Sequence, residues 1–249
     1  MSVEYAETDH IVRIELNRPD RLNATDPTLI DELCRALEAA IVALPAVAVI
    51  SGRGRAFCAG HDLTYEAADV PYAVDRLDVE RTHDITRLIR RAPFPVVSSV
   101  HGYALGAGCE IALCSDLVIA ADDAVFGFPE VSVGLSITGG ISRILPHAVG
   151  LAKAKELVFL GQRFGAAQAQ SWGLVNFVVP SSSLIEETDR LTKQISGLPA
   201  HALGLAKSAL NVGFDGSLDT AFEIETLHAL ETRSAQEARD ATEKFLQRR

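Results

Sequence analysis

Two glutamates and two glycine-bearing stretches are the parts of this sequence whose residue types and spacing could do chemistry. In HGYALGAGCEIALCSD (residues 101–116), Gly106, Ala107 and Gly108 come shortly before Glu110. The apolar residues that follow recur at helical spacing, so the carboxylate lies in the first turn of an expected helix. Because glycine costs a helix about 0.5–1 kcal/mol relative to alanine, its use at this helix start requires a reason.

A backbone binding site would supply that reason. The first four N–H groups of a helix have no acceptor within the helix, and they lie at the positive end of its dipole. Small side chains would let a ligand oxygen come within hydrogen-bonding distance, which describes half of an oxyanion hole. Tight packing of the helix against the preceding strand would require the same small residues, and this stretch alone favours neither explanation.

A second loop offers a matching backbone donor. In RAFCAGHDL (residues 55–63), Gly60 can adopt a positive φ and turn the N–H of His61 outward. Two such N–H groups, one from each of two loops, would hold a single carbonyl oxygen.

A third stretch supplies a second carboxylate. In FGFPE (residues 126–130), Pro129 fixes its own φ and lacks an N–H, so the backbone is rigid just before Glu130. The order of elements brings Glu130 to the same end of neighbouring elements as Glu110. The structural alternative is an ordinary surface residue, which is the usual fate of glutamate.

Strands that alternate with helices must position these groups. A hairpin turn is expected just before the first strand, and apolar runs predict strands over residues 10–16, 46–52, 116–122 and 174–179, with another that begins at Pro95. Asp26 before Pro27 is typical of a helix start. Further helices are expected over residues 72–91, from Gly106 and after residues 181–183, with a loop over 52–63 and a helical tail after about Pro199. Strands separated by helices indicate parallel β-α units.

Composition excludes several classes of protein. The 249 residues are 48% hydrophobic, and the formal net charge of −10 argues against nucleic-acid binding. We expect no membrane span because no run of 18 apolar residues occurs, and no signal peptide is recognised at the N-terminus. The cysteines form no C-x-x-C pair, so neither a zinc site nor a disulfide framework is expected, and a reducing cytoplasm is favoured. The sequences that begin Gly52-Arg-Gly54 and Gly106-Ala-Gly108 both lack the third glycine of a dinucleotide-binding loop.

The three stretches together resemble the crotonase, or enoyl-CoA hydratase/isomerase, superfamily. The motifs AFCAGHDL, HGYALGAGCEIALCSD and FGFPEVSVGL occur in the family's order, and LNRPDRLNA and GLVNFVVP also match its pattern. The motifs are closest to those of enoyl-CoA hydratases. The resemblance covers nearly the whole chain and implies an α/β fold, a crotonase-like spiral of ββα units with a C-terminal helical region.

The resemblance also implies two regions and an assembly. Residues 1–198 would form the catalytic core, and residues 199–249 would serve oligomerisation and complete the acyl-CoA site. Family members commonly form trimers or dimers of trimers. The apolar residues of the expected tail fit a homotrimer-based assembly; they are Phe222, Leu227, Leu230, Phe245 and Leu246.

The implied reaction is hydration of trans-2-enoyl-CoA to 3-hydroxyacyl-CoA, a step of fatty acid β-oxidation. By resemblance, the N–H groups of His61 and Ala107 hold the thioester oxygen, Glu110 activates the water and Glu130 protonates C2. No metal or redox cofactor is required, since coenzyme A is part of the substrate. Substrate contacts are implied for Arg21, Ala59, Gly60, Asp62, Leu63, Gly106 and Gly108. The phosphates of coenzyme A would be met by Arg18 and Arg21, with Arg53 and Arg55 as weaker candidates.

Two alternatives remain open from the sequence. An isomerase of the same superfamily would shift a 3-enoyl double bond with one carboxylate, and a non-catalytic acyl-CoA-binding protein would not need paired glutamates. The chain departs from the usual pattern at Ala107, where glycine is common, and at Ile137-Thr138, where hydratases often carry a proline. The aspartate that dienoyl-CoA isomerases need at the position of Thr138 is absent.

Overall fold

Two β-sheets organise the protein in a computed structural model that describes residues 1–65, 72–234, 239, 243 and 246. The six-stranded sheet has the order β1 (Val3–Thr8), β2 (Ile11–Leu16), β3 (Val47–Gly52), β5 (Val96–Val100), β7 (Leu117–Ala121) and β10 (Phe177–Val179). The four-stranded sheet has the order β4 (Ala56–Cys58), β6 (Tyr103–Leu105), β8 (Val125–Gly127) and β9 (Phe164–Gly165). From β2 to β10 the six-stranded sheet is parallel.

A repeated ββα unit relates the two sheets. Each unit places its first strand in the larger sheet and its second strand in the smaller one, and then continues into a helix. These helices are α2 (Tyr72–Arg91), α3 (Ala107–Cys114) and α4 (Ile141–Val149). The predicted fold class, an α/β spiral of ββα units with a helical C-terminal region, is therefore confirmed.

Most predicted elements occur where their patterns placed them. The first predicted strand, over residues 10–16, is β2, which pairs with β1 across a hairpin turn. α1 (Pro27–Ala43) begins after Asp26, whose carboxylate accepts the N–H of Leu29 at 2.8 Å. The expected loop over residues 52–63 is wrong in part, because it contains β4. Three residues are too few to show a strand's alternation.

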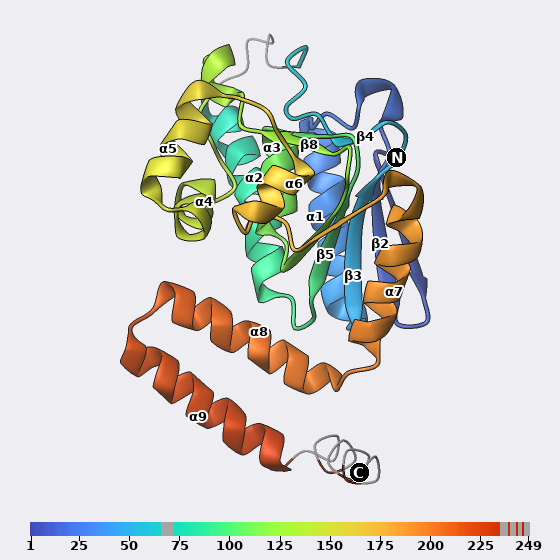
Figure 1. Cartoon of the computed structure of the whole chain (residues 1–249), viewed down its shortest axis with the longest axis vertical. Coiled ribbons are helices and arrows are strands. Elements are labelled where there is room, and N and C mark those ends of the chain that lie inside the picture. Colours follow the sequence, from blue (N-terminus) through green and yellow to red (C-terminus); the bar gives the residue numbers. More distant parts are fainter. Residues whose placement is uncertain (66–71, 235–238, 240–242, 244–245, 247–249) are drawn as a thin grey trace.

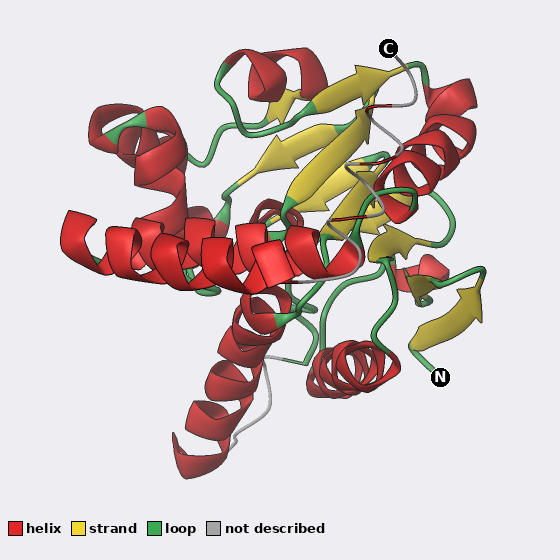
Figure 2. Ribbon diagram, turned by 90° about the horizontal axis from the view of Figure 1, so that it is seen from below, coloured by secondary structure: helices red, strands yellow, loops and turns green. Residues whose placement is uncertain are grey.

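Helices cover both faces of the larger sheet. Figure 2 shows the strands enclosed between helices. α7 (Leu184–Ser196) lies against β3, β5 and β7, while α1 and α2 pack beside each other on the side where Figure 1 also shows α3. The remaining helices of the described core are α5 (Leu151–Leu160), α6 (Ala166–Ser171) and the 3₁₀ turns η1 (Pro19–Arg21), η2 (Glu130–Val133) and η3 (Ser181–Ser183).

The last two described helices, α8 (Ala200–Asp215) and α9 (Leu218–Ser234), lie side by side outside this core (Figure 1). Lys207 anchors α8: its buried ammonium lies 2.6 Å from the Asp116 carboxylate and donates to the carbonyls of Ile89 and Phe94 at 2.6 and 3.0 Å. The predicted boundary at residue 199 falls between α7 and α8. Among the described tail residues, Phe222, Leu227, Leu230 and Leu246 are exposed, and Phe245 lies outside the described residues.

None of the helices in the described part of the chain combines the length and the apolar character needed to cross a membrane.

Candidate active site

Glu110 lies in a helix that is buried on every side. All eight residues of α3 are buried, and Glu110 is only 2% exposed. Its two carboxylate oxygens are held by one residue: Oε1 accepts the backbone N–H of Thr138 at 2.6 Å, and Oε2 accepts the Thr138 hydroxyl at 2.6 Å. Burial raises the pKa of Glu110, and the two bonds from Thr138 oppose that rise because they stabilise the ionised form.

Glu130 is buried without such support. It begins η2, directly after Pro129, and is 5% exposed. Neither of its carboxyl oxygens has a hydrogen-bond partner within the described residues. Burial raises the pKa of Glu130 to about 7, and the charge of Glu110 contributes to the rise. The two glutamates therefore differ in state, because Glu110 is held by donors while Glu130 readily keeps a proton near neutral pH.

The start of α3 lies between the two carboxylates and the other predicted loop. A Cβ added to Gly106 would lie 3.4 Å from Glu130 Oε1 and 3.6 Å from the Cα of Gly60. On the other side, a Cβ added to Gly139 would lie 3.4 Å from Glu110 Oε2. The structure thus brings the two glycine stretches and both glutamates into one site.

The N–H of His61 points away from the segment that carries Thr25. Thr25 and His61 form a parallel bridge in which Thr25 N–H donates to the Gly60 carbonyl at 2.8 Å and Asp62 N–H donates to the Thr25 carbonyl at 2.9 Å. In a parallel bridge the residue opposite such a pair directs its own N–H to the other side. Gly60 permits this turn with φ of +101°.

The N–H of Ala107 is a free helix-start donor. Ala107 is the first residue of α3, and the preceding Gly106 has φ of +53°, in the region that favours glycine. The N–H of Gly106 is already bound to the Gly127 carbonyl at 2.9 Å. Among the described residues, neither Ala107 N–H nor His61 N–H has an acceptor. Both N–H groups are therefore available to a ligand.

The two glycines at this helix start have different structural reasons. Gly106 supplies an unusual backbone conformation beside Glu130, whereas Gly108 supplies close packing. A Cβ on Gly108 would lie 2.2 Å from the carbonyl oxygen of Cys58, so no larger residue fits between α3 and β4.

Some of the other predicted contact residues make contacts inside the protein, and others are exposed at its surface. Asp62 is buried and accepts from Thr64 and from Arg18, and both lower its pKa. Arg18 also pairs with Asp26 at 3.2 Å, so its charge is engaged within the protein. Ala59 is half-buried and Leu63 is exposed.

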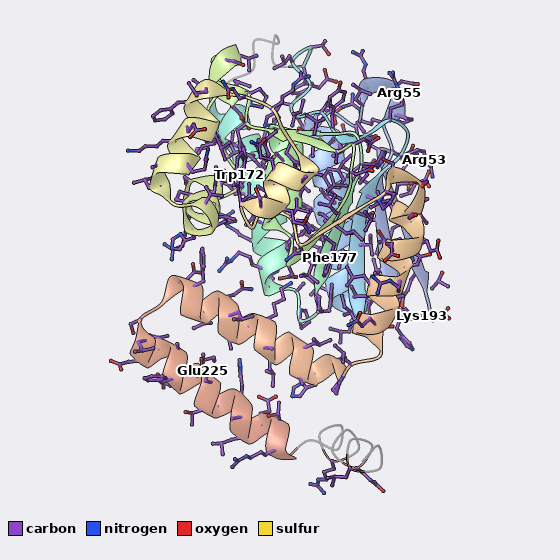
Figure 3. All side chains as sticks on the ribbon, viewed as in Figure 1. Arg53, Arg55, Trp172, Phe177, Lys193 and Glu225 are labelled. Carbon is purple, nitrogen blue, oxygen red and sulfur yellow. The ribbon has the colours of Figure 1, made fainter. Side chains whose placement is uncertain are left out.

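The predicted cations at the surface differ in whether they have partners. Arg53 forms ion pairs with Glu4 and Glu15. Arg21 and Arg55 are exposed and have no ion-pair partner in the described part of the chain. Figure 3 shows Arg53 and Arg55 at the same outer edge of the core, far from Glu225 on α9. Arg21 and Arg55 are therefore the predicted cations available to a ligand.

Two residues of the site were not found from sequence. Thr138 was noted only as the place where an aspartate is missing, and it proves to hold Glu110. Thr86, on α2, donates to the Gly139 carbonyl at 2.7 Å and so supports the segment that carries Thr138. No local pattern marks either contact, since Thr138 and Glu110 are 28 residues apart. The described residues contain no group of three or more side chains that could hold a metal ion.

Comparison with known proteins identifies the family. A family model described as enoyl-CoA hydratase/isomerase matches residues 6–249. A relative from Mycobacterium bovis, named "Probable enoyl-CoA hydratase echA8", is 38% identical over 211 residues, covering 82% of this chain and 79% of its own. The "1,2-epoxyphenylacetyl-CoA isomerase" of Escherichia coli is 34% identical over 248 residues, covering 96% and 93%.

A solved structure matches the whole fold. The crystal structure of an enoyl-CoA hydratase from Bacillus anthracis superposes with a TM-score of 0.94 at 30% identity, covering 100% of this chain and 97% of that one. The resemblance inferred from the motifs is confirmed over nearly the full length, and this chain belongs to the enoyl-CoA hydratase/isomerase family.

Proposed function

We propose that this protein hydrates a trans-2-enoyl-CoA to the 3-hydroxyacyl-CoA. The observation that carries the proposal is the pair of buried glutamates in opposite hydrogen-bonding states, next to two free backbone donors. Addition of water to a double bond needs a base for the water and an acid for the carbon. Glu110 and Glu130 have the environments that these two roles require.

In the proposed reaction the thioester oxygen accepts the N–H groups of His61 and Ala107. These donors stabilise the enolate-like charge that develops as water adds. Glu110 takes a proton from the water while its oxygen bonds to C3, and Glu130 delivers its own proton to C2. A proton must return from Glu110 to Glu130 before the next turnover. The proposed steps use neither a metal nor a redox cofactor, because hydration has no net change of oxidation state, the two N–H groups stabilise the charge and the two carboxyl groups move the protons.

Recognition of the coenzyme A portion is also proposed. Arg21 and Arg55 are supported as phosphate contacts by their exposure and by the absence of ion-pair partners among the described residues. Ala59, Gly60 and Leu63 would lie beside the substrate. Gly106 would keep a side chain out of the site, and Gly108 would let α3 pack closely enough on β4 to bring its first turn to the substrate. Asp62 would fix the loop through its ion pair with Arg18.

A trimer-based assembly is proposed for the oligomeric state. Phe222, Leu227 and Leu230 are more than half exposed on α9, which is an unfavourable arrangement for an isolated helix. Residues 199–249 would then serve oligomerisation and complete the acyl-CoA site. We also propose a reducing, cytoplasmic location, supported by four cysteines that are all free and buried. Light scattering that gives a monomer at micromolar concentration would contradict the assembly.

Ultraviolet absorbance of crotonyl-CoA tests the function directly. A hydratase removes the conjugated double bond, so absorbance falls, whereas a non-catalytic binder leaves it unchanged. Isomerase activity is the second candidate, because the family model that matches residues 6–249 includes enoyl-CoA isomerases as well as hydratases. It would consume a 3-enoyl-CoA but not crotonyl-CoA.

Single substitutions distinguish the two enzymes further. General acid–base groups contribute about 10²–10⁴-fold each. In a hydratase, both Glu110→Gln and Glu130→Gln lose about that factor on crotonyl-CoA. The double variant loses less than the product of the two factors, since the groups act as a unit. In an isomerase, only Glu130→Gln abolishes turnover of the 3-enoyl-CoA. A folded Glu110→Gln protein that hydrates at the unsubstituted rate refutes the two-glutamate mechanism.

A further inference from the structure

The segment of residues 137–140 is the only part of the described chain that donates hydrogen bonds to the Glu110 side chain. Both donors belong to Thr138: the backbone N–H meets Oε1 and the hydroxyl meets Oε2, each at 2.6 Å. Two donors on two oxygens of one carboxylate fix the plane of the group as well as its position. Gly139, with φ of +59°, lets the chain turn immediately beside the carboxylate.

The segment is itself tied to two helices. The Gly139 carbonyl accepts the hydroxyl of Thr86, on α2, at 2.7 Å. The buried thiol of Cys114, at the end of α3, lies 3.3 Å from the same carbonyl and 3.1 Å from the Thr86 hydroxyl. The peptide between Gly139 and Gly140 is therefore held from two sides, which restrains the segment that carries Thr138 beside Glu110.

We propose that Thr138 is a positioning residue for the reaction, which fixes Glu110 as the water-activating base, and that Thr86 supports it by holding Gly139. The inference rests on the proposed function. The assignment of Glu110 as base and Glu130 as acid follows from their hydrogen bonds. The Glu110 side chain accepts two, and the Glu130 side chain accepts none within the described residues. A carboxylate that accepts hydrogen bonds stays ionised more readily than a buried one that accepts none.

Other charged and titratable groups near Glu110 set the background for any pH effect. Glu110 and Glu130 interact, since the charge of Glu110 raises the pKa of Glu130, and His61 and His83 act to lower the pKa of Glu110. The thiols of Cys109 and Cys114 also lie within electrostatic range, and burial raises the pKa of each. All of these side chains are still present when the Thr138 hydroxyl is removed. A shift in the pKa of Glu110 in that variant therefore reports on the loss of the hydroxyl.

Thr138→Val removes the hydroxyl and keeps the shape and the backbone N–H. The loss of one hydrogen bond to a charged group raises the pKa of Glu110, so the acidic limb of the kcat profile for crotonyl-CoA moves up by about one to two pH units. We expect kcat to fall and KM to change little, because the group positions the base rather than the substrate. Thr138→Ser restores both the limb and the rate.

The supporting role of Thr86 is tested in the same way. Thr86→Val moves the acidic limb in the same direction by less than Thr138→Val, and Thr86→Ser restores it. Thr192→Val is the matched control, since within the described residues the hydroxyl of this buried threonine bonds only to the Asp189 carbonyl of the same helix, α7, and its loss should leave the profile unchanged. An unmoved limb in Thr138→Val, or a Thr138→Ser protein as impaired as Thr138→Val, overturns the inference.

Infrared difference spectra separate this inference from the proposed function. The band of protonated Glu110 is identified as the one missing in Glu110→Gln, and its pH midpoint is measured in each full-length variant. If the unsubstituted protein does not hydrate crotonyl-CoA, the proposed function fails, yet the midpoint still decides the role of Thr138. A higher midpoint in Thr138→Val supports the inference, and an unchanged midpoint overturns it.

Discussion

Replacing Glu130 with glutamine should stabilise the protein while it removes activity. Glu130 is 5% exposed, and its oxygens have no hydrogen-bond partner among the described residues. Its ionised form is therefore unfavourable in the folded state. The rise in the pKa of Glu130 from 4.5 to about 7 corresponds to a cost of about 3 kcal/mol, at about 1.36 kcal/mol for each pH unit.

The pH dependence of this cost follows from proton linkage. Between pH 4.5 and about 7 the unfolded chain loses the Glu130 proton while the folded protein keeps it, so stability falls as pH rises. Above about pH 7 both states are ionised, and the full cost is present. Glu130→Gln cannot ionise, and its amide is buried as the neutral carboxyl was. Its free energy of unfolding should exceed that of the unsubstituted protein by roughly 3 kcal/mol at pH 8 and by less than about 1 kcal/mol at pH 5.

Urea unfolding at pH 5 and pH 8, at one protein concentration, measures both values. Glu110→Gln is the matched comparison. Its free energy of unfolding at pH 8 should rise by less than that of Glu130→Gln, because Thr138 already stabilises the Glu110 charge. Equal stability of Glu130→Gln and the unsubstituted protein at pH 8 would show that water or a partner subunit supports the Glu130 carboxylate, and the reasoning from its burial would be wrong.

Three further predictions follow from the same contacts. His61→Ala should lose less than about tenfold in kcat, whereas Ala107→Pro, which deletes a backbone donor, should lose about 10²–10³-fold; a folded, fully active Ala107→Pro enzyme would exclude the oxyanion hole. Because Glu130 must be protonated to act as the acid, kcat/KM for crotonyl-CoA should fall tenfold per pH unit above about pH 7, and a limb beyond pH 9 would contradict this role. Lys207→Met leaves Asp116 without its cation and should cost about 3 kcal/mol in urea unfolding; an unchanged midpoint would show that Lys207 does not anchor α8.

The sequence predicted the parts of the fold that have a local signal. Asp26 and Pro27 marked the start of α1, and the apolar run over residues 46–52 marked β3. β4, β6 and β8 left no such signal, since each has three residues and periodicity needs more. The order of elements still brought Glu110 and Glu130 together, because each follows the second strand of its ββα unit.

Contacts made across the fold were beyond the reach of local patterns. The clamp of Thr138 on Glu110 joins residues 28 positions apart, and no spacing rule relates a loop threonine to a helix glutamate. Gly108 is similar, because its need for glycine comes from the carbonyl of Cys58 on a neighbouring strand. In both cases the residue type is explained by the backbone or side chain that approaches it.

The difference between the two glutamates cannot be deduced from their own positions. Each lies in the first turn of its helical element and each is buried, so helix dipoles and burial act on both in the same sense. The two glutamates differ in their hydrogen-bond donors. Both donors to Glu110 come from Thr138, which lies eight residues after Glu130 in the connection between β8 and α4. The segment that follows Glu130 thus supplies the hydrogen bonds to Glu110. The presence of both glutamates therefore does not by itself assign the acid and the base, because the assignment also depends on where residues 131–140 place Thr138.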